Sequence, residues 1–490
     1  MDPSQITAET LALLEKAQTS GLYVSTGIQG YDLSGLVALI PVNVPARNNT
    51  SAFPRTIAGE GSQTAVWRAL LNINSQQTDA AVGFDYAGSL TLFDEQDVFA
   101  PYKPLAKAGR VTLDAVAVAR NFADALAVAE LQTLNQLFID QDLHIINSQN
   151  WSLGTVSPPT LTPSTTGGTI PASASVNVKV AARSGANYFI GGSTAVSTNA
   201  PVTVSSSGSL NSVTASIAAV KGAVAYDWFV GSTSSNQVYL TTTTVASVTI
   251  TSIPTAAQAL PALPLLSATA PTTPPTADTS YSQNWYNGVI ASTLGDYGST
   301  GPVTPGTSGT NNGSTFIDNG GNAPALSGGG IDVLDKINDQ LWASVQLSPN
   351  AYMVNSTQGD EISKLILSSG SATTFLPPTD ADARTNLAGG GFIGRYINRA
   401  AGGVPVTIEI HPHVAPGTII ARTDRVPFPG SNIGSVFEVR CQYDTMRFDY
   451  AANYNPGTLG GGPRYDFEIR SMETLINRAP VAQAIVANVG

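Results

Sequence analysis

The chain has 490 residues, of which 42% are hydrophobic and only 12% are charged. This length is too great for one ordinary core and predicts two or three domains, and the hydrophobic share excludes a chain that is disordered throughout. The net charge of −11, without clustered Lys and Arg, argues against a general nucleic-acid binder. The single cysteine, Cys441, excludes an intrachain disulfide and a multi-cysteine zinc site.

The first sixty residues predict a short helix and an extended arm. Residues 8–17 have the apolar spacing of a helix that ends before Gly21, and the proline-rich stretch that follows has no helical period. An extended arm gains little by being ordered unless it lies on a neighbour. We therefore assign residues 1–60 to an N-terminal helix and arm.

Residues 61–118 predict an extended β-loop, because apolar residues alternate or run together between Gly- and Asp-containing breaks. Residues 119–154 predict one long helix, since no Gly or Pro interrupts residues 121–148. At 1.5 Å per residue this helix would be about 40 Å long. His144 lies near its expected C-terminal end. The stripe that we expect to be apolar consists of Leu131, Leu134, Phe138 and Ile145.

Residues 155–280 predict an inserted β-sandwich between Pro/Thr-rich linkers. The stretch from 151 to 300 holds only six charged residues, and several short β-rich runs follow one another. About seven short strands at this spacing are typical of an immunoglobulin-like sandwich, with Tyr226 and Trp228 as core or strand-edge aromatics. The expected strands are "VNVKVAA", "NYFIGG", "VTVSS", "VTASIAAV", "AVAYDWFVG", "QVYLTTT" and "SVTITSI".

Residues 281–490 predict an α+β region. A helix over residues 331–345 would place Leu334, Ile337, Leu341 and Val345 on one face, and a second helix would begin with Ser356 or Thr357 as its cap. Strands joined by Gly/Pro turns follow, and the chain is expected to end in a short tail.

The segment "VTIEIHPHVAPGTIIA" holds His411 and His413, two of the three histidines. Glu409, His411 and His413 would point to one side of a strand, so three metal ligands are conceivable. Pro412 and the turn that follows instead predict a partly exposed strand end, which is the interpretation that we favour.

No other motif predicts catalysis. The GxGxxG pattern at residues 389–394 leads into a strand rather than a helix, which argues against a dinucleotide site. The acidic pairs Asp94/Glu95 and Asp360/Glu361 are expected in loop or cap positions. We therefore predict no enzyme activity, no catalytic, cofactor-binding or metal residue, and no cofactor.

The order of these segments resembles the major capsid proteins of tailed bacteriophages with the Hong Kong 97 fold, of the sort that carries an immunoglobulin-like insertion. Residues 101–143 resemble the return strand of the extended loop running into the spine helix. "GGFIGRYINRAAGGVPVTIEIHPHVAPGTIIA" resembles a strand pair of the peripheral and axial domains, which would occupy residues 281–490. "VRCQYDTMRFDYAANY" and the last 26 residues, from "YDFEIRSMETLI" onward, resemble the final strands and tail.

The resemblance implies a shell protein that assembles into hexamers and pentamers of an icosahedral head. Its partners would be further copies, a portal, scaffolding or decoration proteins, and an enclosed double-stranded DNA genome bound without sequence specificity, with no membrane. It would be found in the virion capsid after assembly in the bacterial cytoplasm. Some relatives crosslink a lysine to an asparagine, but nothing beside Lys103 or Lys107 marks the partner groups.

Two alternatives remain open at this stage. A phage tail-tube or fibre protein could carry the same sandwich, although the long helix argues against a tail tube. A carbohydrate-active enzyme would need paired carboxylates in a tryptophan-rich cleft, yet the five tryptophans are spread along the chain.

Overall fold

The computed structural model describes residues 53–57, 63–72, 94–119, 124–206, 208, 210–258, 273–298, 301–304, 314–368, 394–426, 434–450 and 464–490. The chain divides into two compact units, one containing Leu105–Ile139 and Thr445–Ser471, the other Arg47–Pro104, Asp140–Asp444 and Met472–Gly490. Several predicted features lie outside the described residues. These are the helix at 8–17, most of the arm, residues 73–93 of the extended β-loop and the glycine motif before Gly394.

The first unit is built from long strands and a helix. Strands β21 (Phe437–Tyr450) and β22 (Arg464–Asn477) each run from one unit into the other, as do β4 (Lys103–Thr112) and helix α4 (Ala125–Asn147). The sheet order is β1-β21-β22-β4, with β1 covering Arg55–Ile57. In the first unit, Val111 of β4 and Phe467 and Ile469 of β22 pack against Leu137 of α4. An apolar sheet face covered by a helix stripe forms this core.

The long helix is confirmed in part. Helix α4 has 23 residues, so it is about 34 Å long, and the Asp124 side chain caps it by accepting the Leu126 backbone N–H (3.0 Å). The expected stripe is only partly right, because Leu131 is 51% exposed whereas Ile145 is buried. Residues 113–118, expected in the extended β-loop, lie in the separate helix α3 (Leu113–Ala119).

The second unit contains a two-stranded antiparallel ribbon, β2 (Thr64–Asn72) with β3 (Asp94–Pro101). Its buried face presents Ala65, Trp67 and Val98, which pack with Tyr297 and Ile476. The Trp67 indole N–H donates to the Asn477 carbonyl (3.0 Å), so the buried ring has its one polar group satisfied.

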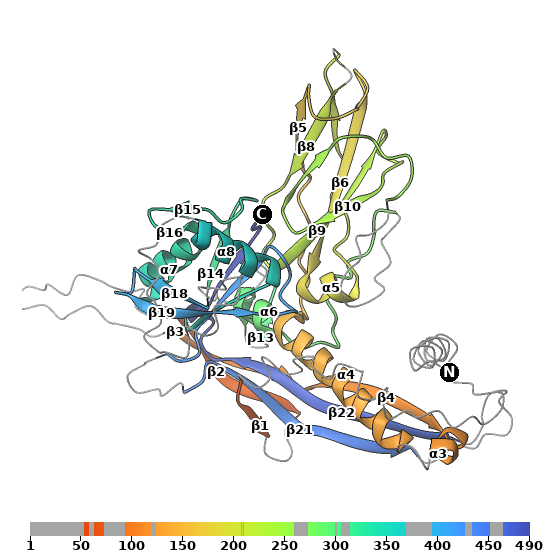
Figure 1. Cartoon of the computed structure of the whole chain (residues 1–490), viewed down its shortest axis with the longest axis vertical. Helices are drawn as coiled ribbons and strands as arrows, with labels where there is room; N and C mark the ends of the chain where they lie inside the picture. Colours follow the sequence, from red (N-terminus) through yellow and green to blue (C-terminus); the bar gives the residue numbers. More distant parts are fainter. Residues whose placement is uncertain are drawn as a thin grey trace, which may run out of the picture. The chain divides into compact units, whose positions relative to one another are not determined.

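Residues 160–250 form a seven-stranded sandwich (Figure 1). One sheet has the order β10-β9-β6-β7 and the other β11-β8-β5. Side chains of both sheets share one core, in which Trp228 and Tyr226 are almost fully buried. The strands are β5 (Thr160–Ser164), β6 (Ser175–Ser184), β7 (Ala200–Thr203), β8 (Ser212–Ser216), β9 (Ala223–Gly231), β10 (Val238–Thr243) and β11 (Ser247–Ile250).

Two details of the predicted sandwich are wrong. "NYFIGG" lies in helix α5 (Gly185–Ile190) and the turn after it, and the seventh strand is β5, inside the stretch that we expected to be a linker. Strand β5 is an edge strand, paired only with β8, and an edge tolerates Pro163, which cannot donate a hydrogen bond. The prolines therefore led us to expect a linker where strand β5 lies.

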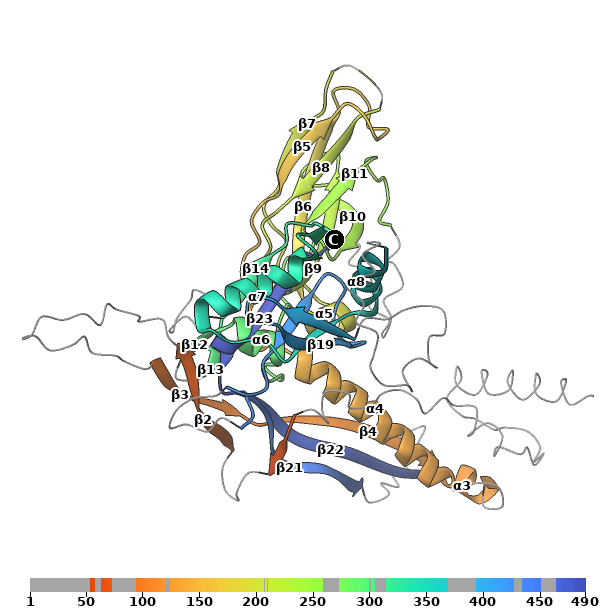
Figure 2. The same cartoon turned by 60° about the vertical axis from the view of Figure 1, so that its left-hand side comes forward.

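A six-stranded mixed sheet forms the centre of the second unit, in the order β14-β23-β20-β17-β19-β18. Helix α7 (Asp332–Val345) lies beside β14 and β23, with its four predicted core residues buried (Figure 2). The strands are β14 (Thr315–Asp318), β17 (Ala351–Val354), β18 (Arg395–Asn398), β19 (Val404–Ile410), β20 (Ile419–Arg422) and β23 (Ala484–Ala487). The α+β class is thus confirmed.

Short elements complete the second unit. These are α6 (Val289–Leu294), β12 (Asp296–Gly298), β13 (Gly301–Val303), β15 (Leu326–Ser327), β16 (Gly330–Ile331), α8 (Ser356–Ser368) and the 3-10 turn η3 (Pro480–Ala482). The cap of α8 is Asn355, whose side-chain oxygen accepts the Thr357 N–H (3.0 Å), rather than Ser356 or Thr357. The expected C-terminal tail is wrong as well, because β23 pairs with both β14 and β20 and is buried.

Replacing Trp228 by Ala should lower the free energy of unfolding by about 3–5 kcal/mol, because a large buried side chain leaves a cavity between the two sheets. Urea unfolding followed by fluorescence measures this. The matched control is Trp342→Ala on α7, which is 42% exposed and should have a much smaller effect. Equal losses in the two variants would contradict the assignment of Trp228 to the core.

Candidate functional site

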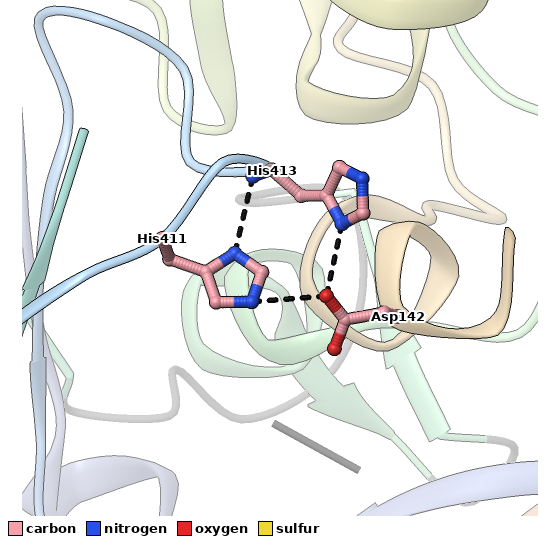
Figure 3. Close-up of side chains that lie close together, drawn as sticks. All are labelled: Asp142, His411 and His413. Carbon is pink, nitrogen blue, oxygen red and sulfur yellow. Dashed lines mark hydrogen bonds and ion pairs between the residues drawn. The ribbon is translucent and has the colours of Figure 1, made fainter. Parts of the chain in front are cut away.

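The two histidines singled out in the sequence lie in one polar cluster with an acid. The cluster consists of Asp142, His411 and His413 (Figure 3). Strand β19 ends at Ile410, and the turn after it is held by the His411 N–H, which donates to the Val354 carbonyl (2.9 Å). Asp142 comes from the last turns of α4. The cluster therefore joins segments about 270 residues apart, both within the second unit.

One carboxylate oxygen contacts both rings. Asp142 Oδ2 is 2.9 Å from His411 Nε2 and 2.9 Å from His413 Nδ1. The His413 backbone N–H donates to His411 Nδ1 (3.1 Å). All three side chains are almost fully buried, with 1–5% exposure.

These contacts define the proton positions. Because His411 Nδ1 accepts a backbone N–H, it carries no proton, so the ring proton of neutral His411 lies on Nε2, facing Asp142. The contact from Nε2 has the distance of an ion pair but not the alignment of a good hydrogen bond. His413 carries a proton on Nδ1 and donates it to the same carboxylate oxygen.

The cluster keeps Asp142 ionised. Burial alone would raise the pKa of Asp142, but its contacts with the His411 and His413 rings, and the positive charge that these rings carry when protonated, outweigh burial and lower the pKa to about 2. A buried carboxylate is tolerated here because donors surround it.

The prediction of a partly exposed strand end is half right. The strand does end before His411, but both histidines are buried. Glu409 is not part of the cluster, since its carboxylate pairs with Arg422 (3.1 Å). Sequence reasoning missed Asp142; the available signal was the run of polar residues in the last turns of a helix, where Gln141, Asp142 and Asn147 are all buried.

The residue types Asp, His and His could ligate a divalent cation, but the proton positions do not fit one. A cation on His411 Nε2 would move the ring proton to Nδ1, and that proton would face the His413 N–H at a heavy-atom distance of 3.1 Å. Two donors would then oppose each other inside the protein. The cluster therefore fits a structural hydrogen-bonded network better than a metal centre.

A second buried polar cluster surrounds Glu473 of β22, which is fully buried. Arg55 Nη2 lies 2.8 Å from the Glu473 carboxylate and 3.0 Å from that of Asp444. The Tyr286 hydroxyl donates to Glu473 (3.0 Å), and Cys441 Sγ lies 3.3 Å from Arg55 Nη2. Cys441 is buried, and burial raises the pKa of its thiol to about 12.

Arg55 belongs to the short segment 53–57, which lies against the edge of β21. Strand β1 pairs in parallel with residues 439–441, and the Phe53 ring packs on Phe437 with centroids 5.1 Å apart. Burial raises the pKa of Glu473, and the charge of Arg55 opposes this shift. A backbone pairing, an aromatic contact and an ion pair thus fix this segment together.

The acidic pairs considered from the sequence do not form paired catalytic carboxylates. Glu95 lies in strand β3 and pairs with Arg68 (3.3 Å). Asp360 lies inside α8 and pairs with Lys364 (2.5 Å), so the loop or cap prediction is wrong for both pairs.

The hollow lined by Trp67, Tyr286 and Asn287 has a volume of 10 Å³, room for about one water molecule. Among the described residues, no helix is long and apolar enough to cross a membrane.

Comparison with known proteins finds similarity only to solved structures. No family model matches the sequence, and no curated protein matches it. A cyanophage A-1(L) capsid chain is 8% identical, with a TM-score of 0.41 and 95% of each chain covered. The holo-SrpI encapsulin complex from Synechococcus elongatus PCC 7942 is 9% identical, with a TM-score of 0.38 and coverage of 97% of this chain and 95% of that one. The capsid of a native GTA particle is 7% identical, with a TM-score of 0.39 and 98% of each chain covered.

Replacing Asp142 by Asn should lower the free energy of unfolding near neutral pH by about 2 kcal/mol, because the depressed pKa of Asp142 is a stability contribution. A carboxyl group whose folded pKa is lowered stabilises the fold above its unfolded pKa. This contribution is lost as the pH falls from about 4 to about 2. Thermal unfolding against pH should therefore be flatter in the variant over that range.

The matched control for Asp142 is Asp339→Asn on the exposed side of α7, which should keep the wild-type pH profile. An unchanged profile in the Asp142 variant would contradict the account of the cluster.

Replacing Arg55 by Ala should destabilise the protein by about 3–5 kcal/mol, because Glu473 would remain as a buried charge without a cationic partner. Adding Glu473→Gln should restore part of that loss, since the second change removes the charge. Arg68→Ala, at a side chain that is 65% exposed, is the control and should cost less than about 1 kcal/mol. Losses that simply add in the double variant would show that Arg55 and Glu473 are not coupled.

Proposed function

We propose that the chain is the subunit of an icosahedral protein shell with the Hong Kong 97 fold, and specifically the major capsid protein of a tailed double-stranded DNA bacteriophage. The observation that carries the proposal is the order of elements along the chain. A docked arm segment, a β-ribbon, a long helix, a two-sheet sandwich and a mixed sheet follow one another, as in the family that the sequence resembles.

The roles of the segments follow from this proposal. Residues 1–60 would be the arm, 61–118 the extended loop and 119–154 the spine helix. Residues 281–490 would form the peripheral and axial domains. The sandwich within residues 155–280 would be an immunoglobulin-like insertion, supported by its seven strands in two sheets around one core.

The polar chemistry of the described residues supports a structural role. The buried acids Asp142, Asp227 and Glu473 each contact a cationic or histidine partner, and these contacts join distant segments of the chain. Such pairing is typical of groups that fix a fold, whereas a hydrolytic site needs carboxylates facing a cleft. We therefore infer that the protein is not an enzyme and holds no cofactor.

The surface composition also favours assembly. Exposed large apolar side chains occur on the ribbon, on β1 and near the end of β21, including Ile57 (71% exposed), Val66 (57%) and Met446 (49%). Such side chains are candidates for contacts with further copies, in hexamers and pentamers of a virion shell. Portal, scaffolding or decoration proteins would be additional partners, and the enclosed DNA would be held without sequence-specific contacts.

Two other functions are the alternatives to this proposal. A nanocompartment shell of the encapsulin kind would use the same subunit plan without packaging a genome. The tail-tube or fibre alternative is less well supported, because the 23-residue helix and the mixed sheet with helices are unusual for a mainly β tube.

Electron microscopy tests the proposal. The protein should be expressed alone and together with the genes that neighbour its own, then examined in negative stain. We expect closed shells, or rings of five and six subunits, with DNA-filled particles only where portal and packaging genes are present. Empty shells that enclose a protein cargo would favour the nanocompartment, and long tubes would favour the tail protein.

A further inference from the structure

We propose that the cluster of Asp142, His411 and His413 is an acid-sensitive clamp, in which a proton taken up by His411 releases the turn after β19. This inference rests on the geometry of the cluster and does not depend on the proposed shell function.

Neutral His411 makes two contacts of opposite kind. Its Nδ1 accepts the His413 backbone N–H (3.1 Å), and its Nε2 faces Asp142 Oδ2 (2.9 Å). Only the neutral ring with its proton on Nε2 is compatible with both contacts, because an imidazolium has N–H donors on both nitrogens. Protonation would therefore turn an acceptor into a donor facing another donor, at a site where His411 is 2% exposed.

The two histidines respond to acid in opposite ways. His413 donates from Nδ1 to Asp142 (2.9 Å), and a positive charge on this ring would strengthen that contact. A positive charge on His411 would also attract Asp142, but it would remove the acceptor that the turn requires. We therefore assign the acid sensitivity of the turn to His411 alone and not to His411 and His413 together.

The described elements in contact with the two rings contribute the following groups. Helix α4 contributes Asp142, and the turn contributes the two histidines themselves. Helix α5 contributes the Phe189 ring, which meets His413 edge-on with centroids 6.0 Å apart. The third histidine, His144 of α4, packs on Trp285 with centroids 5.7 Å apart.

The turn that His411 holds is connected to several elements. The His413 carbonyl accepts the Asn147 side-chain N–H (2.6 Å) at the end of α4, and the Val414 carbonyl accepts that of Asn355 (2.8 Å). The Val489 N–H donates to the Gly417 carbonyl (3.1 Å). Releasing the turn would loosen the end of α4, the start of α8 and the C-terminal strand together.

Amide hydrogen exchange on the full chain tests the clamp. Peptides covering residues 411–418 should be compared at about pH 7.5 and about pH 5.5, a range in which histidine takes up a proton, with rates corrected for the intrinsic effect of pH. We expect the corrected exchange of these peptides to rise about tenfold or more at the lower pH. His144→Gln is the control and should show the same rise.

His411→Asn identifies the responsible group, because an Asn side-chain oxygen can accept the His413 N–H at every pH. This variant should lose the pH dependence of exchange. Unchanged wild-type protection at the lower pH, or an equal rise in His411→Asn, would overturn the proposal. If the His411→Asn variant does not fold, hydrogen exchange at the imidazole C2 position of wild-type His411 is measured in place of that variant. His411 should then gain its proton at the pH where the turn opens, and a proton gained with the turn still protected would overturn the clamp.

Zinc chloride added at about pH 7.5 provides an independent test. We expect no stoichiometric zinc in the washed protein and no change in exchange of the 411–418 peptides. Binding of one zinc ion per chain with added protection of these peptides would show a metal site instead and would overturn the clamp.

Discussion

The buried carboxylate of Glu473 imposes a constraint on a large part of the second unit. It is fully buried, so it requires a cation, and that cation is Arg55, 418 residues earlier in the chain. The ion pair forms where β1 lies against β21, and the Tyr286 hydroxyl and the Gln141 side-chain amide, from two other segments, also donate to Glu473. An unpaired charge here would be costly, so the pair selects one arrangement of the arm segment among many.

The same principle recurs elsewhere in a chain that has few charges. Asp142 joins the last turns of α4 to the turn after β19 through two histidines. In the sandwich, Arg183 and Asp227 are both almost fully buried and pair across β6 and β9 (2.7 Å), with the Thr242 hydroxyl also donating to Asp227 (2.5 Å). Polar groups inside this protein specify which segments meet, while apolar packing supplies most of the stabilisation.

Local pattern predicted much of the fold. The β-rich run "AVAYDWFVG" and the helix expected over residues 331–345 were both predicted correctly, because local sequence pattern determines those elements. The errors have long-range causes. Strand β5 was missed because an edge position tolerates Pro163, and β23 was missed because the partners that bury it, β14 and β20, are distant in sequence.

The candidate site was predictable only in part, for the same reason. The histidines were visible as a pair, but their partner Asp142 lies 271 residues from His413, and Glu409 was the nearer acid with the right alternation. Glu409 instead forms an ion pair with Arg422 of β20. Which acid meets which base is a property of the folded topology and not of local spacing.

A chain whose buried polar groups join distant segments, and whose exposed apolar side chains occur on strands β1, β2 and β21, is suited to assembly. Sedimentation velocity of the purified full chain tests this central claim most directly. The account predicts particles of many subunits, or discrete pentamers and hexamers that convert into them. A single species at the monomer mass of 50.6 kDa, over a wide range of concentration and with its neighbouring gene products present, would contradict it.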